Sequence, residues 1–98
     1  MEIIKDGIIY RLDLTGMACP EQYDVYVGEE QVGYLRLRHG CFTVDYPDYG
    51  GECVYDSTAL DGDGSFSDDI ERNMHLDNAI NAIHKKRSES VDIIGDYP

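Results

Sequence analysis

Apolar and polar residues alternate through residues 23–46, YDVYVGEEQVGYLRLRHGCFTVDY. A period of two is typical of β-strands that bury one face. The alternation is interrupted at His39-Gly40, a two-residue turn in which glycine accepts a positive φ. Such a turn pairs Arg38 with Cys41 and thereby fixes the register of both strands. The facing pairs expected from this register are Leu37 with Phe42, Leu35 with Val44, and Gly33 with Tyr46.

This register divides the side chains between two faces of a sheet. One face is apolar, and together with the preceding strand it is expected to supply core residues. These are Tyr23, Val25, Leu35, Leu37, Phe42 and Val44. The opposite, outer face is polar and carries Tyr34, Arg36, Arg38, Thr43 and Asp45.

The length of the loop between residues 27 and 32 is constrained, because the preceding strand must also turn its apolar residues to the core face. An even loop, residues 28–31, would turn Val25 and Val27 toward the polar face. An odd loop, Glu29 to Gln31, keeps both valines inside. We therefore expect an odd loop or an equivalent bulge. The pairs that follow are Val27 with Gly33, Val25 with Leu35, Tyr23 with Leu37, and Asp24 with Arg36 on the outer face.

The N-terminal region predicts a second hairpin. Asp6-Gly7 is a short turn signal between residues 3–5 and 8–14. The even positions of the second strand are expected to face the core: Ile8, Tyr10, Leu12 and Leu14. Three later segments complete the pattern: a loop at residues 15–21, a short strand from Glu52 to Asp56, and a long loop at residues 58–67.

A helix is expected from Asp68 to Arg87. Ser67 is a candidate N-cap, acids occupy the first turn and bases the last, which complements the helix dipole. An apolar stripe at helical spacing is formed by Leu76, Ala79, Ile80 and Ile83, with Ile70 and Met74 outside it. Residues 90–94 are expected to form a short final strand.

The elements together predict an α+β fold. An antiparallel sheet of about five strands, built from the N-terminal hairpin and the central meander, packs on one C-terminal helix, because only that helix offers a matching apolar stripe. The chain of 98 residues is expected to form a single domain, residues 1–98.

Charge narrows the range of partners. The chain has 20 acidic and 8 basic residues, a formal net charge of −12. Because nucleic-acid binding depends on bases that face phosphates, we expect no direct binding of nucleic acid and a preference for protein partners with a basic surface. No apolar run approaches about 18 residues and no signal segment is visible, which predicts a cytoplasmic protein without membrane contact.

Candidate chemistry is sparse. Cys19, Cys41 and Cys53 lack the close pairing of zinc ligands, and their odd number favours reduced thiols, expected to be small buried residues. His75 and His84 are expected at the surface. The run from Asp61 matches the start of a calcium loop, but Phe66 and Arg72 replace the glycine and glutamate that such a loop requires. We therefore expect no metal, no cofactor and no enzymatic activity.

Two resemblances bear on function. Tyr-x-Val-Tyr, an acidic loop and VGYLRLR resemble the early hairpin of GNAT acetyltransferases, but the pyrophosphate-binding motif of that superfamily is absent. The acidic start of the expected helix would repel a coenzyme A phosphate, so we expect no acetyltransferase activity. GMACPEQYDVY with VGYLRLRHG and VDYP is similar to small uncharacterised proteins of Gram-positive bacteria and their phages.

One segment concentrates negative charge. Between residues 45 and 71 there are acids and tyrosines but neither lysine nor arginine. This favours a non-enzymatic interaction protein, such as a phage-encoded anti-defence inhibitor, that occupies a basic, nucleic-acid-binding site on a protein partner. The candidate contact residues are Asp45, Asp48, Tyr49, Glu52, Tyr55, Asp56, Asp61, Asp63, Asp68 and Asp69.

Three alternatives remain open. The sheet or the loop from Asp61 to Asp69 could serve a small-ligand or cation-binding module. The outer face around Tyr34, Arg36 and Arg38 could instead contact other subunits of a larger assembly, and a homodimer is compatible with the same face.

Overall fold

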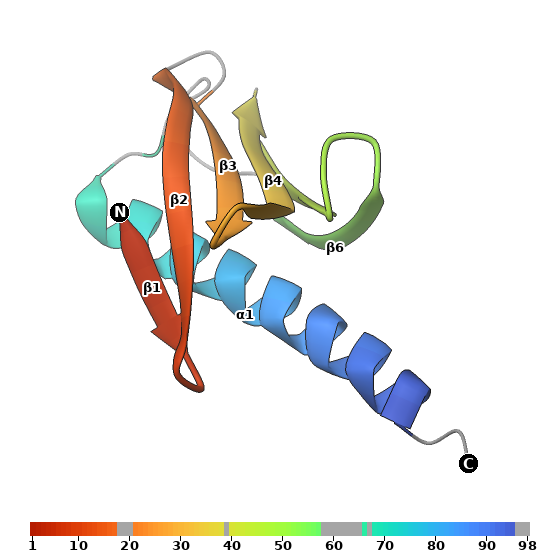
Figure 1. Ribbon diagram of the computed structural model, residues 1–98. Helices are drawn as coiled ribbons and strands as arrows, with labels where there is room; N and C mark the ends of the chain where they lie inside the picture. The colour runs from red at the N-terminus through yellow and green to blue at the C-terminus, as the bar shows by residue number, and fades with distance from the viewer. Residues whose placement is uncertain (18–20, 39, 58–65, 67, 96–98) are drawn as a thin grey trace.

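Six antiparallel strands form one curled sheet, and a single helix lies across one of its faces (Figure 1). The computed structural model describes residues 1–17, 21–38, 40–57, 66 and 68–95. The strands follow in sequence order across the sheet: β1 (Glu2–Lys5), β2 (Ile8–Met17), β3 (Glu21–Val27), β4 (Glu30–Arg38), β5 (Cys41–Tyr46) and β6 (Glu52–Ser57). The helix α1 spans Asp69–Gly95. The α+β prediction is confirmed, with one strand more than the five expected.

The hairpin of β4 and β5 has the predicted register. Arg38 lies opposite Cys41, and Leu35 and Leu37 lie opposite Val44 and Phe42. These four apolar side chains are at most 1% exposed. Gly40 supplies the positive φ of the turn, at 74°. Alternation alone was therefore sufficient to assign the buried face.

The pairing of β3 with β4 corrects one prediction. Tyr23 lies opposite Leu35 and Val25 opposite Gly33, so the expected partners were wrong by two positions. The turn is shorter than the expected three residues. The odd number of residues between the paired positions comes from a bulge, in which Val32 is the extra residue of β4. The side chains of β3 therefore keep the predicted sides of the sheet, since a bulge had been expected as the equivalent of an odd loop. Asp24 consequently faces Tyr34 instead of Arg36.

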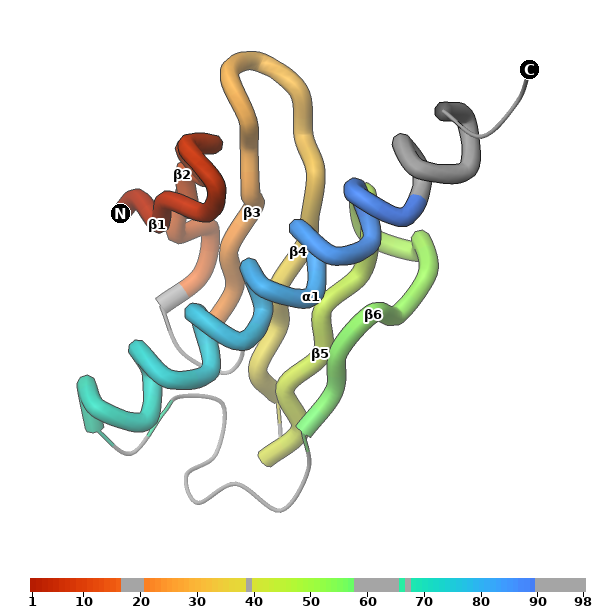
Figure 2. The backbone as a smooth tube through the Cα atoms, turned by 90° about the horizontal axis from the view of Figure 1, so that it is seen from below, coloured from red at the N-terminus to blue at the C-terminus, as the bar shows by residue number. Residues whose placement is uncertain are grey.

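Close packing between α1 and the sheet depends on Gly33. A Cβ atom at this position would overlap the side chain of Ile83. Ile83 is fully buried, as are Leu76, Ala79 and Ile80, which confirms the predicted stripe. Figure 2 shows α1 crossing the strands on this inner face. Ile70 and Met74 lie outside the stripe and are exposed.

The first hairpin forms as predicted around Asp6-Gly7, but β2 is longer than expected. It continues to Met17, and β3 begins at Glu21, so the loop predicted over residues 15–21 was wrong at residues 15–17 and 21, while residues 18–20 lie outside the described residues. A bulge between Leu14 and Gly16 lets the strand continue through this segment. Leu14, expected in the core, is half exposed beside the bulge.

Helix α1 also differs from its prediction at both ends. Asp68 caps the N-terminus, since its Oδ1 accepts a hydrogen bond from the Glu71 amide at 2.7 Å; the expected cap, Ser67, lies outside the described residues. The predicted strand at residues 90–94 is wrong, because the helix continues to Gly95. Neither glycine nor proline occurs between residues 70 and 94, so the sequence holds no helix stop before Gly95.

Aromatic residues close one end of the core. His75, expected at the surface, is only 5% exposed. Its ring stacks on Phe66 at a centroid distance of 5.5 Å and meets Phe42 edge-on at 5.7 Å. A histidine on the helix face adjoining the stripe can thus replace an apolar residue when aromatic rings surround it. The expectation of buried cysteines fails at Cys53, which is exposed.

A core substitution tests this packing. Leu37→Ala should lower the free energy of unfolding by about 2–5 kcal/mol, because it removes buried methyl groups and leaves a cavity. Ile70→Ala is the control, since Ile70 is 82% exposed and its truncation removes little buried surface. Urea unfolding followed by circular dichroism measures both. Equal midpoints for the two variants would contradict the assignment of Leu37 to the core.

Candidate interaction surface

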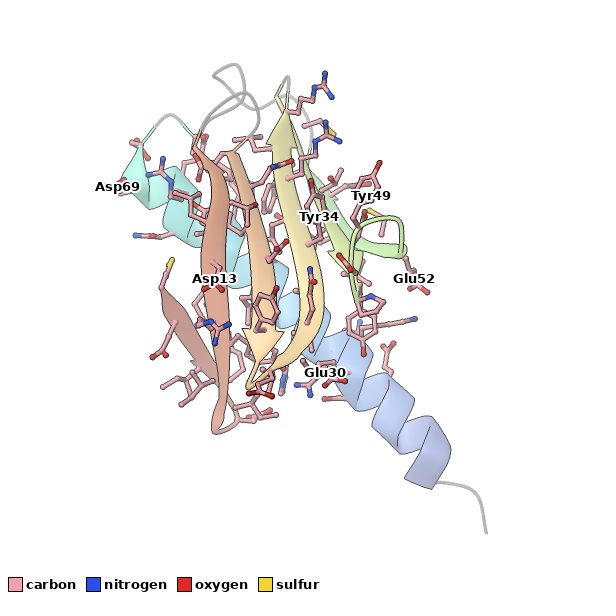
Figure 3. The ribbon with its side chains drawn as sticks, turned by 45° about the horizontal axis from the view of Figure 1, so that its top comes forward. Asp13, Glu30, Tyr34, Tyr49, Glu52 and Asp69 are labelled. Atoms are coloured by element: carbon pink, nitrogen blue, oxygen red, sulfur yellow. The ribbon has the colours of Figure 1, made fainter. Side chains whose placement is uncertain are left out.

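The outer face of the sheet lies on the side away from α1 (Figure 3). A single row of facing residues crosses four strands on this side. Asp13 of β2 lies opposite Asp24 of β3, Asp24 lies opposite Tyr34 of β4, and Tyr34 lies opposite Asp45 of β5. Neighbouring strands are about 4.8 Å apart. Three carboxylates and one phenol therefore line up across the sheet.

The loop after β5 extends this row. Tyr49 is 71% exposed and meets Tyr34 edge-on, with ring centroids 5.4 Å apart. The adjacent Asp48 accepts hydrogen bonds through Oδ1 from the Tyr49 amide at 2.6 Å and from Gln31 Nε2 at 3.0 Å. Figure 3 shows the two tyrosines side by side at the edge of the face. We refer to Asp13, Asp24, Tyr34, Asp45, Asp48 and Tyr49 as the acidic face.

The acidic face has uncompensated negative charge. Partial burial raises the pKa of the Asp24 carboxyl, and the nearby carboxylates of Asp48 and Asp13 raise it further. Burial also raises the pKa of Tyr34. Asp13 has a cation partner, Arg11, whose Nε lies 3.1 Å from its Oδ1. In the part of the chain that the structure describes, Asp24, Asp45 and Asp48 form no ion pair.

Other predicted contact residues lie elsewhere or are already engaged. Glu52 pairs with Lys86 at 2.8 Å. Tyr55 is partly buried against the core, with its hydroxyl 3.2 Å from His75 Nδ1. Asp56 is exposed on β6. Asp61 and Asp63 lie outside the described residues.

The helix start forms a separate acidic site. Asp68 caps α1, and Asp69 pairs with Arg72. Figure 3 shows Asp69 beyond the edge of the sheet opposite to the edge where Tyr49 and Glu52 lie. Among the described residues of segment 45–71, the acids therefore lie at two separate places.

Sequence reasoning had overlooked Asp13 and Asp24 as part of the candidate surface. The alternation of apolar and polar residues places both on the outer side of their strands, but Asp24 was expected to face Arg36, which would have neutralised it. The bulge at Val32 places Tyr34 there instead. The alternation of apolar and polar residues in β2 and β3 was enough to place both acids on the outer face. The sequence did not show the position of the bulge, which decides that Tyr34 and not Arg36 faces Asp24.

Arg36 and Arg38 occupy another part of the outer face. They border a shallow pocket whose other lining residues are Cys41 and Thr43. Tyr34, the third residue of the alternative contact set, belongs to the acidic face. The structure therefore assigns the three residues to two adjoining regions of opposite charge.

A buried ion pair fastens the sheet to the start of α1. Glu21 is 2% exposed and accepts hydrogen bonds from Arg72 Nε at 2.9 Å and Arg72 Nη2 at 3.2 Å. Tyr23 donates its hydroxyl proton to Glu21 Oε2. Burial and this carboxylate raise the pKa of Tyr23, while the hydrogen bonds to Glu21 raise the pKa of Arg72. The cluster holds β3 against α1.

A second polar cluster fastens the first hairpin further along α1. The Tyr10 hydroxyl lies 2.7 Å from His84 Nδ1, and His84 Nε2 lies 2.7 Å from an Asp6 carboxylate oxygen. Arg87 donates to the same hydroxyl at 3.2 Å. The order Asp, His and hydroxyl resembles a relay for nucleophilic catalysis. Tyr10 is fully buried, however, so its hydroxyl serves packing here.

Within the described residues, no group of three or more metal-ligating side chains comes together. The same part of the chain contains no helix long and apolar enough to cross a membrane. Comparison with known proteins finds no matching family model, no similar curated protein and no similar solved structure. The functional argument therefore depends on the residues of the outer face.

The electrostatics of Asp24 predict a pH-dependent effect. Because its pKa is raised on folding, the folded protein favours the protonated carboxyl, and stability falls as pH rises from the unfolded pKa of about 3.9 through the folded value. Asp24→Asn should therefore unfold at a higher urea concentration than the wild type at neutral pH. The advantage should shrink as the pH approaches about 4. Glu29→Gln, in the exposed β3–β4 turn, is the control, and an advantage independent of pH would contradict this origin.

The Glu21 to Arg72 pair gives a second test. Arg72→Met leaves a buried carboxylate without its cation and should cost about 3 kcal/mol of unfolding free energy. Arg11→Met is the matched control, because the Arg11 to Asp13 pair is nearly half exposed and should contribute less than about 1 kcal/mol. Urea unfolding at neutral pH compares the two. Similar losses would show that the buried pair has no special structural role.

Proposed function

We propose that this chain is a non-enzymatic acidic interaction protein that occupies a basic, nucleic-acid-binding site on a protein partner. The observation that carries the proposal is the row of Asp13, Asp24, Tyr34 and Asp45 across four strands. Such a row presents fixed negative charge on a rigid sheet rather than on a flexible tail.

The geometry suits a partner that normally binds a polyanion. Asp13 and Asp24 are neighbours at about one strand spacing, and Asp45 lies two strands beyond Asp24, about 10 Å away. Tyr34 and Tyr49 add amphipathic contact area of the kind enriched at protein interfaces. The net charge of −12 steers the whole molecule toward a basic surface.

The proposed setting is the bacterial cytoplasm, with the chain acting as a phage-encoded inhibitor of a defence protein. This setting depends on the resemblance drawn from GMACPEQYDVY, VGYLRLRHG and VDYP, which no compared protein matches, and the acidic face is the structural feature that suits it. Defence proteins that bind nucleic acid through basic grooves are the class of partner that this face would fit.

A second candidate function is that of a subunit in a larger assembly, including a homodimer. Ile4 and Ile9 face each other on the outer side of β1 and β2 and are 63% and 49% exposed. An exposed apolar pair beside a polar face is a common feature of subunit contacts. Two copies of the acidic face would repel each other, which favours a basic partner over self-association.

The test combines one charge reversal with the loss of one exposed ring. Asp24→Lys with Tyr49→Ala should abolish capture of basic nucleic-acid-binding proteins from a bacterial lysate by the immobilised protein. The matched control, Glu29→Lys with Ile70→Ala, changes the same charge and removes one exposed apolar side chain away from the acidic face. Mass spectrometry identifies the captured proteins, and circular dichroism checks the fold.

Two further measurements make the outcome decisive. Added duplex DNA should compete for the captured protein, and its association rate should fall steeply with salt, because steering between opposite charges is screened. Equal capture by the test and control variants would contradict the proposal. Loss of capture only on reversal of Asp61, Asp63, Asp68 and Asp69 together would move the contact to the helix start.

A further inference from the structure

The outer face also contains a positively charged pocket. Arg36, Arg38, Cys41 and Thr43 line it, at the end of the sheet where β4 turns into β5. Arg36 lies opposite Thr43 and Arg38 opposite Cys41 in the strand register, so the pairing of β4 with β5 holds all four residues together. The pocket has an accessible volume of about 180 Å³ and is open to solvent.

Both arginines belong to the half of the basic residues that form no ion pair with a carboxylate in the described part of the chain. Four of the eight bases form ion pairs with carboxylates: Lys5, Arg11, Arg72 and Lys86. Among the described residues no carboxylate pairs with either Arg36 or Arg38. By register, the nearest acids on this face are Asp45 of β5 and Asp24 of β3, which lie diagonal to Arg36 at about 7–8 Å, and neither forms an ion pair with it.

A buried donor without a partner lies at the same place. Arg36 Nε is shielded from solvent and makes no hydrogen bond within the described part of the protein. Buried N–H groups in native proteins almost always have an acceptor. An external oxyanion cannot reach this shielded Nε–H, but a guanidinium that borders an open pocket and pairs with no carboxylate offers its other N–H groups to such a ligand.

We propose that the pocket formed by Arg36, Arg38, Cys41 and Thr43 binds the phosphate group of a small phosphate monoester. Two guanidinium groups provide two positive charges, which match a phosphate monoester of charge about −1.5 to −2 better than a carboxylate of −1. Their planar N–H groups suit bidentate contact with phosphate oxygens. The Thr43 hydroxyl adds a further donor. This inference is independent of the proposed binding of a basic protein.

The position beside the acidic face makes the site selective. The carboxylates at Asp24 and Asp45 repel extended polyanions, whereas a single phosphate group needs only the pocket. The site is therefore expected to accept a small phosphate and to reject a duplex nucleic acid.

The Arg36 Nε–H group reports on the state of its guanidinium. In a ¹⁵N-labelled protein its resonance should shift saturably as phenyl phosphate or inorganic phosphate is added at about pH 7.5, where phosphate is largely doubly charged. Chloride and acetate at matched ionic strength should give only small linear shifts. Saturation with both phosphates identifies the phosphate group as the ligand, whereas saturation with phenyl phosphate alone assigns a contribution to the organic part of the ester.

Conservative variants separate geometry from charge. Arg36→Lys and, independently, the more exposed Arg38→Lys keep the charge but lose the planar fork, and each should weaken phosphate binding about tenfold or more. Arg11→Lys makes the same change on the same face beside Asp13 and should bind phosphate as the wild type does. The backbone amide of Thr43 follows binding in the Arg36 variant.

Three results would contradict phosphate binding at this pocket. Shifts that remain linear with phosphate concentration, or that are the same in Arg36→Lys, Arg38→Lys and Arg11→Lys, would overturn the proposal and indicate an ionic-strength effect. Saturable binding of acetate with the same affinity as phosphate would also overturn it, since the site would then be selective only for negative charge.

Discussion

The contact between Ile83 and Gly33 is the constraint on which the rest of the structure depends. The absence of a Cβ atom at Gly33 lets α1 approach the sheet closely enough to bury its whole apolar stripe. With one face of the sheet covered, strands β3 to β5 direct their core residues to that side. The polar residues of β2 to β5 are thereby placed together on the other side, where they form the acidic face and the arginine pocket.

The bulge at Val32 determines which polar residues meet. It preserves the sidedness of β3 and β4 while it shifts their pairing by two positions, so Asp24 faces Tyr34 and loses Arg36 as its neighbour. One local irregularity therefore has two effects. It leaves a carboxylate uncompensated in the row and a guanidinium uncompensated at the pocket, and both candidate sites depend on this separation of charge.

The polar clusters beside the core have a different role. Glu21 with Arg72, and Tyr10 with His84 and Asp6, link strands to two parts of α1 through hydrogen bonds. Their groups resemble catalytic ones, but Glu21 and Tyr10 are buried and satisfied. These clusters therefore stabilise the contact between the sheet and α1.

The sequence by itself determined the sidedness of the strands, the β4–β5 register, the stripe on α1 and the net charge. These properties are local or additive: alternation, a two-residue turn at His39-Gly40 and helical spacing need no knowledge of distant contacts. Tertiary structure alone decided the bulges and the burial of His75 among aromatic rings. It also decided that Asp13 and Asp24 lie on the same face as Asp45 and Asp48, while Asp69 does not.

Bulge positions depend on how neighbouring strands fit against the helix, and a surface charge pattern depends on which strands become neighbours. Neither is encoded within a single segment of the chain.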